Sequence, residues 1–207
     1  MRKTNFKQTR VLGVVLVTLL LVQQLSGCAK VHMTVTDLKR NLSGISVTIR
    51  TFDEESNIID RINGKSVNIT RDTTFDSSSE SKDSSVIKIT VGSNEINHVG
   101  SSLVMADKGL NDIFDEYKKS ADIENSDSSV PVINRVVHSV INDTTGKKRT
   151  VLIRSQNGTP LATYMGDKVS TFSVDIPKTT AFLIDGKLLI VYRCDYTVYD
   201  TELLLEE

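Results

Sequence analysis

Cys28 is the residue whose chemistry the sequence defines most sharply. It ends the run Leu25-Ser26-Gly27-Cys28, and a thiol is the side-chain group that can be joined to a diacylglycerol by a thioether. Ser26 and Gly27 are small enough for an extended chain to enter a peptidase, and Leu25 suits an apolar peptidase pocket. We therefore expect cleavage between Gly27 and Cys28, after which Cys28 carries acyl lipid as the new N-terminus.

The segment that precedes Cys28 supports this interpretation. Residues 2–10 contain basic side chains and no acidic one, and residues 11–22 form an apolar run. As a helix this run would be roughly 18 Å long, whereas a bilayer core is about 30 Å thick, and glutamines at 23 and 24 end it. The pattern resembles the lipobox signal peptide of bacterial lipoproteins. The resemblance implies that residues 1–27 are removed and that a diacylglycerol or palmitate-type anchor holds the chain on the outer, extracytoplasmic face of the cell membrane.

The other side chains with catalytic potential are isolated from one another. His32, His98 and His138 lie far apart, and none belongs to a His-Glu-x-x-His pattern that would place two metal ligands on one helical face. No nucleophile elbow, phosphate loop or dinucleotide fingerprint is present. We therefore expect no catalytic activity, no metal and no cofactor apart from the lipid. The alternative is a cell-envelope enzyme that uses Cys194 with a histidine.

Aromatic residues near the C-terminus form a candidate ligand-binding strand. Tyr192 and Tyr196 would share one face of a strand, and Arg193 and Tyr199 the other. A tyrosine-rich strand with an adjoining arginine can stack on and hydrogen-bond a sugar or a peptide. Cross-strand aromatic packing explains the same pattern.

Composition limits the class of partner. Without residues 1–27 the chain has 21 basic and 26 acidic residues, a net charge of −5. This argues against nucleic acid as a partner and against charge-driven binding of anionic envelope polymers. If Cys28 carries lipid, Cys194 has no partner for an intramolecular disulfide, so the fold must be stable through its core. Richness in Asn, Ile, Lys, Ser and Thr indicates an AT-rich genome and a Gram-positive source.

Hydrophobic periodicity predicts the elements. Residues 28–44 are expected to be a tether with a short helix that Thr36 caps and in which Leu38 and Leu42 share a face. Ser77–Ser85 is expected to be a mobile surface loop. Hairpins are predicted at Asn63-Gly64, around Gly92-Ser93-Asn94 and at Asp185-Gly186. Residues 149–155, 161–165 and 169–174 are expected to form a meander. Apolar alternation predicts strands at residues 45–52, 58–62, 66–70, 85–91, 95–99, 102–105, 149–155, 161–165, 169–174, 179–184 and 187–199.

Two amphipathic helices are predicted at residues 107–119 and 131–143. Together with the strands they predict an α+β fold of antiparallel β hairpins and a meander, sandwich-like in arrangement. The expected organisation is a cleaved signal peptide at 1–27, a lipidated tether at 28–44 and a single extracytoplasmic domain at 45–207.

The mature region also resembles an uncharacterised family of small Gram-positive lipoproteins known as a domain of unknown function. The stretches that carry the resemblance are Ser85–Val91 with His98-Val99-Gly100, Ala106–Leu110, and Leu183–Leu188 with Arg193 and Tyr196. The resemblance implies no known activity. We expect a membrane-anchored binding or accessory module whose partner is another envelope protein or a small ligand, and a structural or exclusion role is the other non-enzymatic alternative.

Overall fold

Three β-sheets make up most of the folded chain, and the largest has seven strands. The computed structural model describes residues 32–115, 137 and 148–205, which all belong to the compact unit His32–Glu207. The spatial order of the large sheet is β1 (His32–Met33), β10 (Val169–Val174), β11 (Thr179–Ile184), β12 (Lys187–Tyr192), β7 (Ser102–Asp107), β2 (Ser46–Phe52) and β3 (Ile58–Lys65). In this sheet β1 runs parallel to β10, and all other neighbours are antiparallel.

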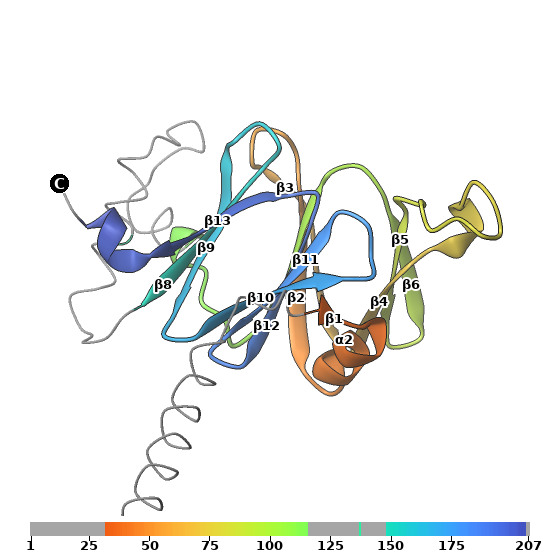
Figure 1. The fold of residues 1–207 in the computed structure, drawn as a ribbon, viewed down its shortest axis with the longest axis horizontal. Coiled ribbons are helices and arrows are strands. Elements are labelled where there is room, and N and C mark those ends of the chain that lie inside the picture. Colours follow the sequence, from red (N-terminus) through yellow and green to blue (C-terminus); the bar gives the residue numbers. More distant parts are fainter. Residues whose placement is uncertain (1–31, 116–136, 138–147, 206–207) are drawn as a thin grey trace, which may run out of the picture. The chain divides into compact units, whose positions relative to one another are not determined.

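Two three-stranded sheets lie on either side of this large sheet (Figure 1). One has the order β13, β8, β9 and the other β4, β5, β6. Two short 3₁₀ helices, η1 and η2, complete the described elements. Their bounds are β4 (Val67–Arg71), η1 (Thr73–Phe75), β5 (Ile87–Val91), β6 (Asn94–His98), β8 (Arg149–Arg154), β9 (Pro160–Gly166), β13 (Asp195–Asp200) and η2 (Thr201–Leu204).

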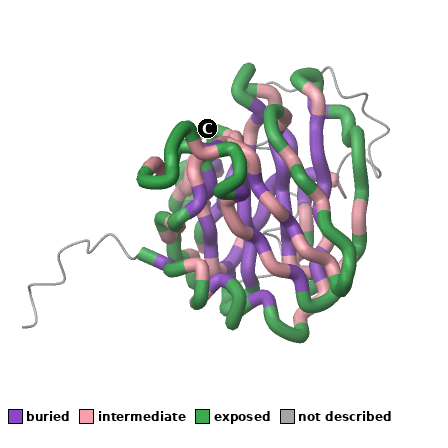
Figure 2. Tube along the Cα trace, turned by 90° about the vertical axis from the view of Figure 1, so that its right-hand side faces the viewer, coloured by how far each residue is buried: buried purple, intermediate pink, exposed green. Residues whose placement is uncertain are grey.

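Strand β12 lies in the middle of the large sheet and contributes side chains to two hydrophobic cores. Successive side chains of a strand point to opposite faces of its sheet. Leu188 and Ile190 therefore pack with the β4-β5-β6 side, whereas Leu189 and Val191 pack with the β13-β8-β9 side. Figure 2 shows the resulting pattern, with buried residues along the strands and exposed residues in the connections. A continuous apolar run in the sequence thus corresponds to a strand covered on both faces.

A short helix, α2 (Val35–Leu42), covers part of the β4-β5-β6 side. Thr34 caps it in a capping box with Asp37, and Leu38 and Leu42 form its buried face. The sequence predicted this helix and its two buried leucines, but with Thr36 as the cap. Because β1 also pairs with β10, residues 32–44 of the predicted tether fold together with the domain.

The α+β class with two amphipathic helices is wrong. The described residues are mostly β, with 52% strand and 13% helix, and α2 is the only helix of seven or more residues among them. Asp107 was expected to cap a helix, but it ends β7 and pairs with Val47, because ladder hydrogen bonds to β2 continue to that point. Helical residues begin at Ile113. Residues 116–119 and the second predicted helix lie outside the described residues, apart from Val137, which is helical and buried.

The turn at Asp185-Gly186 is confirmed, and so is the hairpin of β5 and β6. Asp185 and Gly186 have φ values of 50° and 79°, as a type I′ turn requires. The prediction of a hairpin at Asn63-Gly64 is wrong, because β3 continues through Gly64 and pairs with β2 there. A Cβ atom at Gly64 would lie 2.6 Å from Cγ1 of Val91. The glycine therefore allows close packing between sheets, which the sequence alone could not distinguish from a turn.

The predicted meander and the long final strand are each divided between sheets. Strand β10 pairs with β11 and β1 instead of β9. Residues 187–199 form β12 and β13 in different sheets, with a bend at Arg193, whose φ is 51°. No helix in the described part of the chain has the length and apolarity needed to cross a bilayer.

Candidate functional site

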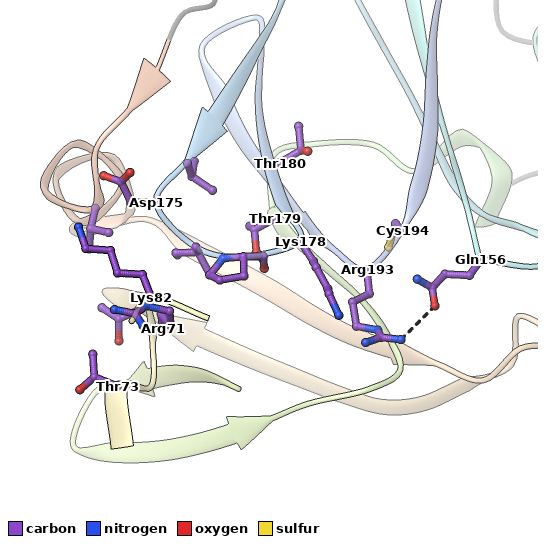
Figure 3. A pocket seen from close by; sticks show the side chains of 15 residues that line it. Arg71, Thr73, Lys82, Gln156, Asp175, Lys178, Thr179, Thr180, Arg193 and Cys194 are labelled. Carbon is purple, nitrogen blue, oxygen red and sulfur yellow. Dashed lines mark hydrogen bonds between the residues drawn. The ribbon is translucent and has the colours of Figure 1, made fainter. Parts of the chain in front are cut away.

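A pocket of about 880 Å³ opens where the turn between β10 and β11 faces the end of β4 and the bend between β12 and β13. Its walls come from segments that are far apart in the sequence (Figure 3). The lining residues with polar or charged side chains are Thr70, Arg71, Thr73, Lys82, Gln156, Asp175, Lys178, Thr179, Thr180, Arg193 and Cys194. We call it the cationic pocket, because four of these side chains are basic and only Asp175 is acidic.

Two of the charged groups contact a side chain elsewhere in the domain. Arg71 binds Asp76, and Asp175 lies 3.2 Å from Nε2 of His32. Lys82, Lys178 and Arg193 have no carboxylate within ion-pair distance among the described residues. The pocket therefore holds three cationic side chains whose charge nothing in the described domain neutralises.

Lys178 and Arg193 are held next to each other by the backbone. The N–H of Arg193 donates to the carbonyl of Lys178 at 2.9 Å. Both residues have positive φ, 57° at Lys178 and 51° at Arg193, a region in which residues with a Cβ carry a conformational cost. Figure 3 shows their side chains together on one side of the pocket, with Arg71 and Lys82 on the other.

The Arg193 guanidinium is held by one hydrogen bond, but not all of its N–H groups have an acceptor in the described part of the chain. Its Nη2 donates to Oε1 of Gln156 at 3.2 Å, and its carbonyl accepts from Oγ of Ser102 at 2.8 Å. Its Nε is buried without a hydrogen-bond partner among the described residues. A buried N–H of this kind is costly to leave unpaired, and a bound acceptor would relieve that cost.

Residues 77–85 form the loop that brings Lys82 to the pocket. Asp83 accepts hydrogen bonds from the N–H of Ser77 at 3.0 Å and from Oγ of Ser81 at 2.7 Å. These bonds hold the pKa of Asp83 well below its usual range. Asp76 accepts from the N–H of Ser84 at 2.9 Å and also binds Arg71. The segment predicted to be a mobile surface loop is thus tied by carboxylates to one wall of the pocket.

Of the four residues proposed from the sequence as a ligand-binding face, the cationic pocket contains Arg193 alone. Tyr192 is fully buried, and its hydroxyl donates to the carbonyl of Ser85 at 2.6 Å. Tyr196 packs edge-on against Phe182, with ring centroids 4.9 Å apart. The Tyr199 hydroxyl accepts from Nη2 of Arg154 at 3.4 Å. The bend at Arg193 separates Tyr192 from the two tyrosines of β13.

Cys194 and His98, the described members of the suggested enzyme site, each contact main-chain carbonyls. The Cys194 sulfur donates to Leu103 at 3.6 Å and to Tyr192 at 3.3 Å. His98 Nε2 contacts the carbonyl of Ser101 at 2.9 Å. No hydrogen bond joins Cys194 to a histidine in the part of the chain that the structure describes, and His138 lies outside that part.

We predict that the Cys194 thiol of the native protein reacts slowly. Burial raises its pKa to about 12, so at pH 8 the thiolate is rarer than in an unfolded chain by on the order of a thousandfold. The same shift means that the thiol favours the folded state below the unfolded pKa, and that this contribution is lost as the pH rises towards 12. Reaction with a disulfide reagent at pH 8, compared between native and denaturant-unfolded protein, measures the effect. Cys194→Ala provides the background, and equal native and unfolded rates would contradict the prediction.

A buried polar cluster of Arg50, Asp112 and Tyr164 lies apart from the cationic pocket and was not foreseen from the sequence. Nη2 of Arg50 donates to Oδ2 of Asp112 at 2.7 Å and to the Tyr164 hydroxyl at 2.8 Å. Oδ1 of Asp112 accepts from the N–H of Thr163 at 3.0 Å. Burial raises the pKa of Asp112, an effect that Arg50 opposes, and burial also raises the pKa of Tyr164. These contacts join β2, β9 and the segment after β7.

Sequence reasoning missed Arg71, Lys82, Gln156 and Lys178 as members of a site. They come from four separate segments, and no short motif connects them. The positive φ of Lys178 sets this residue apart, but it is a property of the structure that the sequence does not show. Among the described residues, no three His, Cys, Asp or Glu side chains gather in a way that could hold a metal ion.

Comparison with known proteins yields a family and no function. Neither the curated proteins nor the solved structures contain a significant match to this chain. A family model described as a domain of unknown function, DUF5052, matches residues 10–204 and therefore includes all the segments that line the cationic pocket. Because the match extends over nearly the whole chain, the protein belongs to the DUF5052 family.

Proposed function

We propose that this protein is a membrane-anchored, extracytoplasmic lipoprotein whose domain binds a ligand in the cationic pocket without chemical conversion. The observation that carries the binding role is the pocket itself. Its volume of about 880 Å³ is within the range of small-molecule sites, and side chains from separate elements converge on it.

The lining chemistry suits binding better than catalysis. Catalysis by a nucleophile needs an adjacent base that can take its proton. The pocket's thiol, Cys194, donates to carbonyl oxygens instead, and burial raises its pKa. Apart from the Asp175 carboxylate, its other polar groups are ammonium, guanidinium, amide and hydroxyl groups, which donate hydrogen bonds to a ligand and keep it in place.

The membrane anchor is supported by the leader and by Leu25-Ser26-Gly27-Cys28. A chain with two acyl groups stays at a membrane for long times, because about 0.8 kcal/mol is gained for each buried methylene. A binding domain held in this way captures its ligand at the outer face of the membrane. Its partner is then a small ligand, or the part of an envelope protein that carries the recognised group.

Photo-crosslinking in intact cells tests the binding role. A benzophenone amino acid replaces Thr73 or Thr180 in the full chain, since both residues line the pocket. The control carries it at Lys65, which is exposed on β3 and outside the pocket lining. We expect the two pocket positions to yield the same adduct and the control to lack it. Absence of an adduct at Thr73 and Thr180, or the same adduct at Lys65, would refute binding in this pocket.

A further inference from the structure

We propose that the ligand of the cationic pocket carries a phosphate group, which Lys178, Arg193 and Lys82 bind; the inference rests on the proposed function. The charge of the residues that line the pocket favours an anionic ligand. The chain without its leader has a net charge of −5, yet four of the five charged residues that line the pocket are basic. The charge of the pocket is therefore opposite in sign to the net charge of the protein. This difference directs an anion to the pocket rather than to the rest of the surface.

The number of unneutralised cations favours a multiply charged anion. Arg71 is already paired with Asp76, and Asp175 lies against the imidazole of His32. Lys82, Lys178 and Arg193 remain without a carboxylate among the described residues. A carboxylate has two oxygens and one charge, whereas a terminal phosphate has three oxygens and nearly two charges. Phosphate thus matches this set of donors more closely.

The type of donor points the same way. Arginine presents a planar fork of N–H groups that matches phosphate oxygens, and lysine adds a mobile point charge. Gln156 holds one guanidinium nitrogen of Arg193, while the buried Nε has no partner among the described residues. The hydroxyls of Thr73 and Thr180 also line the pocket.

The backbone provides an independent argument. Lys178 and Arg193 both occupy positive φ, where glycine or asparagine would be accommodated more easily. Local strain of this kind persists where the surrounding structure enforces it, and it gathers at ligand-binding sites. Here two strained positions, joined by one hydrogen bond, both carry cationic side chains that line the same pocket.

The pocket is larger than a phosphate group. Its volume of about 880 Å³ leaves room for the rest of a ligand, and apolar side chains form part of its wall. These are Val35, Val174, Ile176 and Pro177. We infer that the phosphate belongs to a larger molecule, either a soluble phosphate compound or a lipid headgroup that ends in a phosphate monoester.

Calorimetric titration of the full chain in detergent tests the proposal. The probes are inorganic pyrophosphate for a soluble phosphate, glycerol 3-phosphate for a headgroup that ends in a phosphate monoester, and citrate for a carboxylate of similar charge. We expect one of the two phosphate probes to bind, and Lys178→Gly or Arg193→Asn to weaken binding about tenfold or more. Lys65→Gln removes an exposed positive charge outside the pocket and should leave the affinity unchanged.

The variants are chosen so that misfolding cannot imitate loss of binding. Glycine and asparagine adopt positive φ more readily than lysine or arginine, so the melting temperature of each variant should equal or exceed that of the parent. Tighter binding of pyrophosphate assigns a soluble phosphate, and tighter binding of glycerol 3-phosphate assigns a headgroup. Equal or tighter binding of citrate would overturn the assignment to phosphate, as would phosphate binding that neither variant weakens.

Failure of this proposal is distinguishable from failure of the proposed function. If no phosphate probe binds but Thr73 and Thr180 still capture an adduct in cells, the pocket binds a ligand of different chemistry. If no phosphate probe binds and capture also fails, both proposals are refuted.

Discussion

Replacement of Arg50 by methionine should destabilise the domain by about 3–5 kcal/mol, a large part of the 5–15 kcal/mol that holds a typical domain folded. The Arg50 side chain is 6% exposed, and its guanidinium binds both Asp112 and Tyr164. The variant would leave the Asp112 carboxylate buried without its cation. For a domain of this size we expect a fall in melting temperature of about 10 °C. Urea unfolding of the full chain in detergent measures the change directly.

Arg40→Met is the matched control for this variant. Arg40 also forms an ion pair, with Asp37 at 3.2 Å, but its side chain is 75% exposed. An exposed pair of this kind contributes well under about 1 kcal/mol. An Arg50→Met variant no less stable than Arg40→Met would show that the buried cluster does not hold β2 and β9 together.

The double variant Arg50→Met with Asp112→Leu separates the cost of an unpaired charge from the loss of the cluster as a whole. Removing both charges leaves no uncompensated ion, so we expect this variant to recover part of the stability lost in Arg50→Met. If the stability lost in the double variant equals the sum of the losses in Arg50→Met and in Asp112→Leu alone, the two side chains act independently.

Replacement of Cys28 by alanine should abolish lipid attachment completely. Alanine has no thiol for a thioether, so the proposed diacylglycerol cannot be added and the leader should remain or the chain be shed. Metabolic labelling with an alkyne fatty acid, followed by fractionation of membranes, measures both outcomes. The unlipidated chain should migrate as an uncleaved or shed form without label.

Cys194→Ala is the control for the lipidation test. It removes the other cysteine of the chain, whose thiol lies in the folded domain and donates to two main-chain carbonyls. Label should therefore be unchanged in Cys194→Ala. Persistence of lipid label in Cys28→Ala would refute the anchor at this residue.

The strand predictions succeeded where alternation and turn residues act locally. The β5-β6 and β11-β12 hairpins were predicted from apolar runs on either side of a glycine-containing turn, and the structure confirms both. At Gly64 the same reasoning failed, because a glycine can serve a turn or a close contact between sheets. The helix predicted at residues 107–119 does not begin at Asp107, because the hydrogen-bond ladder between β7 and β2 continues through that residue.

The cationic pocket was beyond sequence reasoning for a related reason. Lys82 and Lys178 are separated by most of the domain in the sequence, and each by itself has the pattern of a solvated basic residue. Of the residues singled out as a ligand-binding face, only Arg193 lines the pocket, because positive φ at that residue directs the chain from one sheet into another. Because of this bend, Tyr196 and Tyr199 lie on β13, in a different sheet from Tyr192.

The sequence by itself determined the positions of most strands, the type I′ turn at Asp185-Gly186 and the leader pattern that ends at Cys28. These depend on residues that are neighbours in the chain, where sterics and alternation act directly. Only the tertiary structure decided which strands pair, that β12 is buried on both faces, and that cations from separate segments gather at one pocket. Alternation specifies which side chains share a face of a strand, but not which strand or loop packs against that face.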